Sequence, residues 1–238
     1  MTTQIASTRT ARPGRRGAVR LAALAGAGYT AAWITSLSLG APNPAVAASG
    51  RQVVTAFAGH SGPALAQFAL NEGVAAVALA VVVLSVARAA SRAGRARAGL
   101  AAAAAGLAAA GISWAQLAMG TWLFGALVPD RRAVSAGTVY HAITRMDGAK
   151  MLLLAAMALA IAELARRPGI LPTWLAALGA VLAAALVISG LGYLLLVAGL
   201  SSAVYVSGIL LLIFVSATGI SLHRRGEQGL RAHAIRNR

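Results

Sequence analysis

The chain has 238 residues, of which 59% are hydrophobic and 11% are charged. A soluble domain usually has about 25% charged residues, so this composition excludes an ordinary water-soluble fold, whose surface so few ionised groups would not cover. The net charge of +16 is spread over both ends and several connections, not over one continuous face, which argues against nucleic-acid binding; the absence of cysteine excludes disulfides, thiol catalysis and iron–sulfur ligation.

Several stretches are long and apolar enough to cross a bilayer, which takes about 20 mostly apolar residues. Six of them lie near residues 19–40, 63–88, 99–127, 148–166, 172–198 and 203–222. The alternating pattern of a transmembrane strand is absent. The predicted fold class is therefore all-α: a polytopic transmembrane helical bundle of about six spans, with basic tails at 1–18 and 223–238.

The first stretch has two interpretations. Arginines precede its apolar run, and Ala45-Val46-Ala47 after it is typical of a signal-peptide cleavage site, which would leave five spans and a mature start at Ala48. The apolar part of a signal peptide has about 7–15 residues, whereas this run has about 20. The length favours a helix that is retained in the membrane.

The connections differ in character. Residues 41–62 form the longest outer connection, and Val53, Val54 and Phe57 predict a short interfacial helix there. Residues 128–147 form a polar connection. About four residues, 199–202, join the last two spans, which predicts a tight antiparallel hairpin. In the fifth span, Gly190 and Gly192 are the candidates for the mid-span break that many transporters use.

Arginine and lysine counts in the connections predict the orientation, because cytoplasmic loops carry the excess. Sixteen of the 21 cations lie in the N-terminal tail, the second and fourth connections and the C-terminal tail. The opposite side has Arg51, Arg131, Arg132, Arg145 and Lys150. With an even number of spans, both termini are predicted to be cytoplasmic. These arginine clusters are also expected to contact anionic lipid, at about 1 kcal/mol per cation.

Small residues recur at helical spacing. Ala22, Gly26 and Thr30 are four residues apart, as are Gly111 and Ala115. Such spacing lets helix backbones approach closely. We expect packing within one bundle, with a homo- or hetero-oligomer contact as the alternative.

Polar residues of three spans fall at a similar depth. Glu72 lies 16 residues before Arg88, so a helix would place it about 24 Å from the cytoplasmic end, near the outer edge of the hydrocarbon. Ionisable groups in a membrane are costly and often functional. The residues expected to converge at this level are Gln67, Asn71, Glu72, Gln116, Arg145, Asp147 and Lys150.

This set also has two interpretations. It is a polar pocket for a small solute, ion or lipid head group, or it is a structural network in which Glu72 pairs with Lys150 or Arg145. Glu163 differs, because Arg166 and Arg167 follow it at the spacing of an intrahelical ion pair.

No metal or cofactor site is predicted. All four histidines fall outside the expected spans, which disfavours a haem held between helices. His60 and His141 with Glu72 or Asp147 would supply zinc ligands, but the helical spacing of a zinc site is missing. The chain also lacks the HExxH, GxSxG and phosphate-loop motifs of enzymes.

The segments Arg145-Met146-Asp147-Gly148-Ala149-Lys150-Met151 and Leu171-Pro172-Thr173-Trp174-Leu175 resemble the six-helix integral membrane proteins common in actinobacteria. This resemblance implies a multi-pass protein of a bacterial plasma membrane and carries no established activity. The function we expect is binding or transport of a small solute, ion or lipid. A structural or scaffold subunit without ligand is the alternative, and an intramembrane enzyme is the second alternative.

Overall fold

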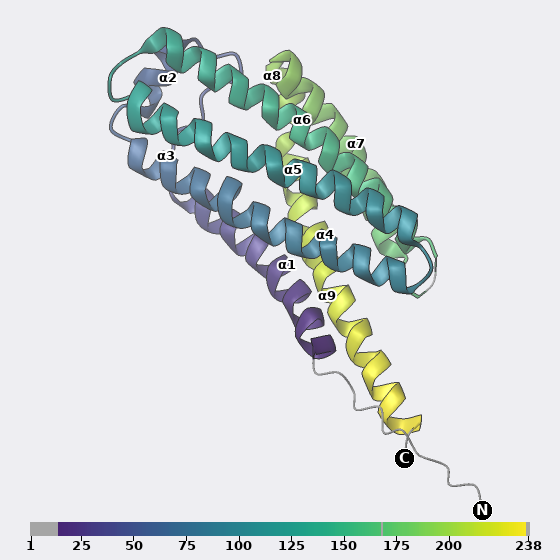
Figure 1. The fold of residues 1–238 in the computed structure, drawn as a ribbon. Coiled ribbons are helices and arrows are strands. Elements are labelled where there is room, and N and C mark those ends of the chain that lie inside the picture. The colour runs from purple at the N-terminus through teal and green to yellow at the C-terminus, as the bar shows by residue number, and fades with distance from the viewer. Residues whose placement is uncertain (1–13, 168, 237–238) are drawn as a thin grey trace, which may run out of the picture.

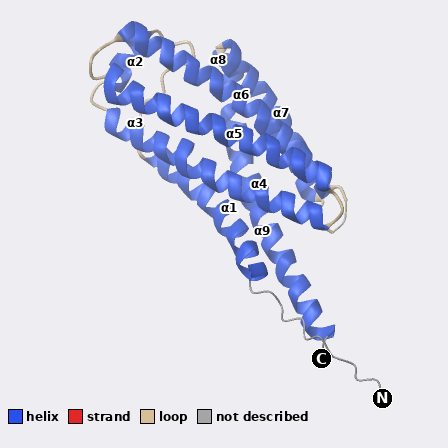
Figure 2. Ribbon diagram, in the orientation of Figure 1, coloured by secondary structure: helices blue, strands red, loops and turns tan. Residues whose placement is uncertain are grey.

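The computed structural model describes residues 14–167 and 169–236. This part of the chain is helical and contains no strand, so the all-α fold class is confirmed (Figure 2). The tail predicted at 1–18 lies outside the described residues as far as residue 13. The predicted C-terminal tail is not a separate segment, because the last helix continues through it to Arg236.

Nine α-helices and two π-helical segments (η) make up the described residues. In chain order they are α1 (Gly14–Ser38), α2 (Gly50–Phe57), α3 (Ser61–Phe68), η1 (Ala69–Val74), α4 (Ala75–Arg92), α5 (Ala96–Trp122), η2 (Leu123–Leu127), α6 (Ala133–Ala165), α7 (Trp174–Leu195), α8 (Ala198–Ser201) and α9 (Val204–Arg236). The segments α3, η1 and α4 form one continuous rod, as do α5 and η2.

Five helical rods are long and apolar enough to cross a membrane, which supports a membrane location for the chain. Their ranges are Ser61–Arg92, Ala96–Leu127, Ala133–Ala165, Trp174–Leu195 and Ala198–Arg225. Helix α1 occupies most of the first expected span, but it is not among these five. Trp122 and Trp174, both exposed, lie near rod ends, where a membrane protein places aromatic anchors.

The long helices run antiparallel and close into a ring. The order of neighbours is α1, α4, α5, α6, α7 and α9, and α9 returns to α1 (Figure 1). One apolar core fills the interior, built from side chains such as Val83, Met157, Leu182 and Phe214. The start of α1, the end of α9, and the α4–α5 and α6–α7 connections lie together at one end, here called the basic end (Figure 1).

Helix α1 is fastened to α9 by small and hydroxyl side chains. Thr30 Oγ1 lies 2.7 Å from Ser216 Oγ, and Ser216 Oγ donates to the Gly26 carbonyl at 2.8 Å. A Cβ on Gly219 would collide with the Ala22 carbonyl oxygen. The close packing predicted for the first small-residue set is thus present within the bundle. The second set behaves differently, because Gly111 and Ala115 are exposed on α5.

A second, smaller core covers the end opposite the basic end. The short helix predicted in the 41–62 connection is present as α2, and its Phe57 meets Phe124 edge to face at 4.8 Å. Phe68 of α3 also packs edge to face with Phe124, at 5.2 Å between ring centroids. The Tyr140 hydroxyl donates to the Pro44 carbonyl at 2.7 Å, which ties this connection to α6.

The expected start of the fourth span was wrong. Helix α6 begins at Ala133 instead of 148, so most of the predicted polar connection is helical. Its polar side chains Tyr140 and His141 form hydrogen bonds to the 41–62 connection, which compensates for their polarity. Helix α7 is continuous through Gly190 and Gly192. These glycines instead permit close packing: a Cβ on Gly148 would lie 2.6 Å from the Gly190 carbonyl oxygen.

Candidate functional site

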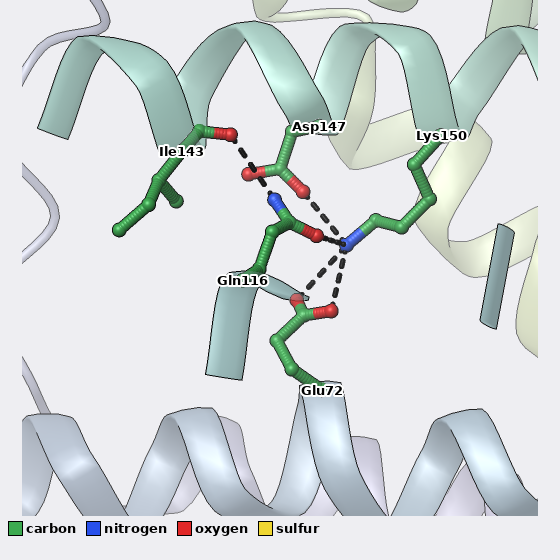
Figure 3. A network of polar contacts seen from close by, with 5 residues as sticks. All are labelled: Glu72, Gln116, Ile143, Asp147 and Lys150. Carbon is green, nitrogen blue, oxygen red and sulfur yellow. Dashed lines mark hydrogen bonds and ion pairs between the residues drawn. The ribbon is translucent and has the colours of Figure 1, made fainter. Parts of the chain in front are cut away.

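Four polar side chains from three rods meet inside the bundle. Glu72 comes from η1, Gln116 from α5, and Asp147 and Lys150 from α6; we call this set the lysine network (Figure 3). Asp147 and Lys150 are three residues apart and therefore share one face of α6. Their neighbour Gly148 lets α7 pack closely beside them.

Lys150 is the centre of the network. Its Nζ donates to Glu72 Oε1 at 2.9 Å and Oε2 at 2.8 Å, and to Gln116 Oε1 at 2.8 Å. Asp147 Oδ1 lies 2.7 Å from the same nitrogen. Gln116 Nε2 donates to the Ile143 carbonyl at 3.1 Å. An ammonium group has three N–H donors, so the three acceptor side chains match the donors of Lys150.

The network is deeply buried and carries unequal charge. Gln116 is fully buried, and Glu72 and Lys150 are 7% and 9% exposed. The Asp147 side chain is 25% exposed, which makes it the most exposed member of the network. One lysine faces two carboxylates, so the ionised set has a net charge of −1. Burying charge is costly unless it is paired and hydrogen-bonded, and these contacts supply that compensation.

The π-helical segment η1 positions Glu72. It interrupts the rod Ser61–Arg92 between two α-helical stretches, and π-segments within α-helices are frequent at functional sites. Both Glu72 and the following Gly73 are buried here. No feature of the sequence distinguishes Ala69–Val74 from an α-helix, so the π-helical segment was not predicted.

Three of the seven residues expected to converge do not join the network. Arg145 is exposed, and no ion pair to it occurs within the described residues, so the alternative pairing of Glu72 with Arg145 is wrong. Gln67 is partly buried and makes no side-chain hydrogen bond to the described chain. Asn71 lies beside Glu72 in sequence, and its buried Oδ1 has no hydrogen-bond partner there.

Two aromatic residues of α1 belong to the same region and were missed from the sequence. Tyr29 is 3% exposed, and its hydroxyl lies within electrostatic range of Lys150 and Glu72. One turn later, the buried Nε1 of Trp33 has no hydrogen-bond partner in the described structure. Their spacing of four residues was visible in the sequence, but only the docking of α1 on η1 relates them to the network.

The other candidate groups lie apart from the network. His141 Nε2 bonds to the Ala48 carbonyl at 3.0 Å and the exposed His60 Nδ1 to the Ala58 carbonyl at 3.1 Å. Within the described ranges, no group of three His, Cys, Asp or Glu side chains is placed to hold a metal ion. The ion pair predicted at Glu163 is confirmed, with Arg167 at 3.4 Å and Arg166 at 3.7 Å.

The network thus offers charged and amide oxygens around one cation, with one carboxylate closer to the surface than the rest. Such a set can lock three helices together, and its extra negative charge can attract a cation. Comparison with family models, with curated proteins and with solved structures finds no match for this chain.

Proposed function

We propose that the chain is a six-span protein of a bacterial plasma membrane with both termini in the cytoplasm. Three observations support this topology. Helix α1 closes the ring between α4 and α9, the start of α1 and the end of α9 lie at the basic end, and sixteen of the 21 cations were assigned to that side from the sequence. A cleaved signal peptide would remove α1 and open the ring.

Two measurements test this topology. A reporter fused to the C-terminus should be active in the cytoplasm, and the purified protein should retain its N-terminal segment. Reporter activity on the outer side would refute the orientation. A mature chain that starts at Ala48 would refute the retained first span.

For the lysine network, the function supported best is binding of a small cationic solute or ion. The observation that carries this proposal is that two carboxylates share one buried lysine, which leaves one negative charge without a compensating cation. Asp147, the more exposed carboxylate, is the expected contact. The buried Asn71 Oδ1 is a further acceptor, since it has no partner among the described residues. Acceptors in excess of donors favour a ligand that donates hydrogen bonds.

The experiment measures the thermal stability of the full-length protein in detergent with sodium, potassium or ethylammonium chloride at constant ionic strength. A cation that binds only the folded protein stabilises it by mass action, by about 2.7 kcal/mol at 100 times its Kd. Asp147→Asn removes the excess charge and should abolish this stabilisation. Asp130→Asn is the matched control, because Asp130 pairs with Arg132 outside the network. Equal stabilisation of both variants, or none of the wild type, would refute cation binding.

A structural subunit without ligand is the second candidate. The matching of Lys150 donors by acceptors from two other rods supports it, since such a network can serve to hold helices in register. In that case Glu72→Gln should reduce stability without any separate loss of a cellular phenotype. Co-purification of a partner subunit would favour this candidate.

A further inference from the structure

A second polar region lies at the basic end, away from the lysine network. A pocket of ≈ 430 Å³ opens between the α4–α5 turn and the end of α6. Its charged lining residues are Arg95, Arg97, Arg167 and Glu163, and the first turn of α5 is part of the pocket wall. Arg95, Arg97 and Arg167 belong to the arginine clusters that are expected to contact anionic lipid, and the pocket gives this expectation a defined site.

The pocket has more positive charge than the protein neutralises. Glu163 already pairs with Arg166 and Arg167 on its own helix. The other four acids of the chain are engaged elsewhere, in the pairs Glu72–Lys150, Asp147–Lys150, Asp130–Arg132 and Glu227–His223. Arg95 and Arg97 therefore have no carboxylate partner in the described part of the chain. With three arginines and one glutamate, the lining has a net charge of +2.

The backbone of α5 adds to this field. Helix α5 starts at Ala96, and no side chain caps its first turn. The N–H groups of a first helical turn lack intrahelical acceptors, and the helix dipole favours an anion beside them. The turn that presents them is well defined: Arg95 N donates to the Ala90 carbonyl at 2.8 Å, and Gly94 takes a φ of +73° that suits glycine.

An apolar surface continues from the pocket along α5. Leu100 and Leu107 are 68% and 39% exposed. They lie three and ten residues after Arg97, so they share its side of the helix. A ligand with a charged head and an apolar tail would fit this succession, with the head in the pocket and the tail along α5.

We infer that this pocket binds a phosphate group, with an anionic phospholipid of the adjoining leaflet as its source. Guanidinium groups bind phosphate oxygens in a bidentate manner, and the free N–H groups of an uncapped helix start donate to the same oxygens. Basic pockets between membrane helices on the cytoplasmic side are suited to lipid head groups. Free phosphate has the same chemistry as the head group, but it has no apolar tail to contact the exposed leucines. This inference does not depend on cation binding by the lysine network.

The test compares two double variants of the full-length protein in detergent. Arg95→Gln/Arg97→Gln removes two cations from the pocket. Arg88→Gln/Arg92→Gln removes two exposed cations from the end of α4, which are not part of the pocket lining. Native mass spectrometry counts bound phosphatidylglycerol, with phosphatidylcholine and inorganic phosphate as the other probes. Circular dichroism and gel filtration verify that each variant folds.

The wild type should retain phosphatidylglycerol in preference to phosphatidylcholine. The pocket variant should bind it on the order of tenfold more weakly, whereas the control variant should match the wild type. Arg97→Lys, which keeps the charge but loses the bidentate donor, should give an intermediate loss. Displacement of the lipid by millimolar inorganic phosphate would support the phosphate site and assign it to a soluble source. Equal weakening in both double variants, or no binding of either phosphate probe to the wild type, would refute the site.

Discussion

The lysine network and the Glu163 cluster contain the same kinds of charged groups in opposite proportions. In the network, one lysine serves two carboxylates at 2.7–2.9 Å, with Glu72 and Lys150 almost fully buried. In the cluster, one glutamate meets two arginines at 3.4–3.7 Å, and all three side chains are at least 46% exposed. Water and salt screen the second set but not the first.

This difference separates the consequences of losing each group. A buried charge that loses its partner keeps its desolvation cost, whereas an exposed one is solvated again at once. We therefore expect mutations in the network to affect folding and mutations in the cluster to affect surface binding. Four predictions test this contrast.

Lys150→Met should have the largest effect. It leaves Glu72 and Asp147 without their shared cation, and the expected loss is about 3–5 kcal/mol in the free energy of unfolding. Denaturant unfolding of the full-length protein in detergent measures it. Arg167→Met, which truncates a cation in the cluster, is the control. If both variants lose the same amount, burial does not distinguish the two regions.

A double-mutant cycle of Glu72→Gln and Lys150→Met should be non-additive by about 1–3 kcal/mol. Glu72→Gln alone should cost less than Lys150→Met, because Lys150 keeps Asp147 and Gln116 as acceptors. In the double variant, the partly exposed Asp147 is the one network carboxylate that loses its cation, and the Gln116 amide loses a donor. The unfolding free energies of the three variants give the coupling. Strictly additive losses would contradict a direct interaction between Glu72 and Lys150.

Gln116→Leu should destabilise the protein by about 0.5–1.5 kcal/mol, as expected for a hydrogen bond between membrane helices. The change keeps a similar volume but removes one acceptor of Lys150 and the donor to the Ile143 carbonyl. Gln67→Leu is the control, because Gln67 lies outside the network on the neighbouring rod. A loss at Gln67 as large as that at Gln116 would point to general helix packing instead.

Glu163→Gln should have the smallest effect, below about 1 kcal/mol, and the effect should fade between about 0.1 M and 1 M salt. The cost of Lys150→Met should depend less on salt over this range, since Glu72 and Lys150 are buried. Unfolding at the two salt concentrations measures both, with a salt whose cation does not stabilise the wild type. An equal salt dependence at Lys150 and Glu163 would contradict the difference in burial.

The sequence located most helices because hydropathy is a property of each residue. Runs of about 20 apolar residues predicted the rods that contain α4, α5, α7 and α9 to within a few residues at most of their ends. The start of α6 was not predicted, because Tyr140, His141 and Asp147 lower the hydropathy of a segment that is helical. Their polar groups are satisfied by Pro44, Ala48 and Lys150, and such partners are distant in sequence.

The candidate site shows the same division. Counting residues from the basic end brought Glu72 and Gln116 to one depth, Lys150 was expected to enter its span from that same outer side, and these three do meet. Depth alone also included Arg145, but this residue lies two positions before Asp147. At about 100° per residue, the two are about 200° apart and face opposite sides of α6. Helix geometry could therefore have excluded Arg145 from the predicted site on the sequence alone.

The amino-acid sequence by itself determined the helical class, the apolar rods and the depth of their polar residues, because helix rise and hydrophobicity act locally along the chain. Only the tertiary structure decided which faces meet. The docking of α1 brings Tyr29 to the lysine network, the π-helical turn η1 sets the position of Glu72, and the approach of the α4–α5 turn to the end of α6 forms the arginine pocket. These features depend on the rotation of each helix about its axis, which is fixed only when all the long helices of the ring pack together.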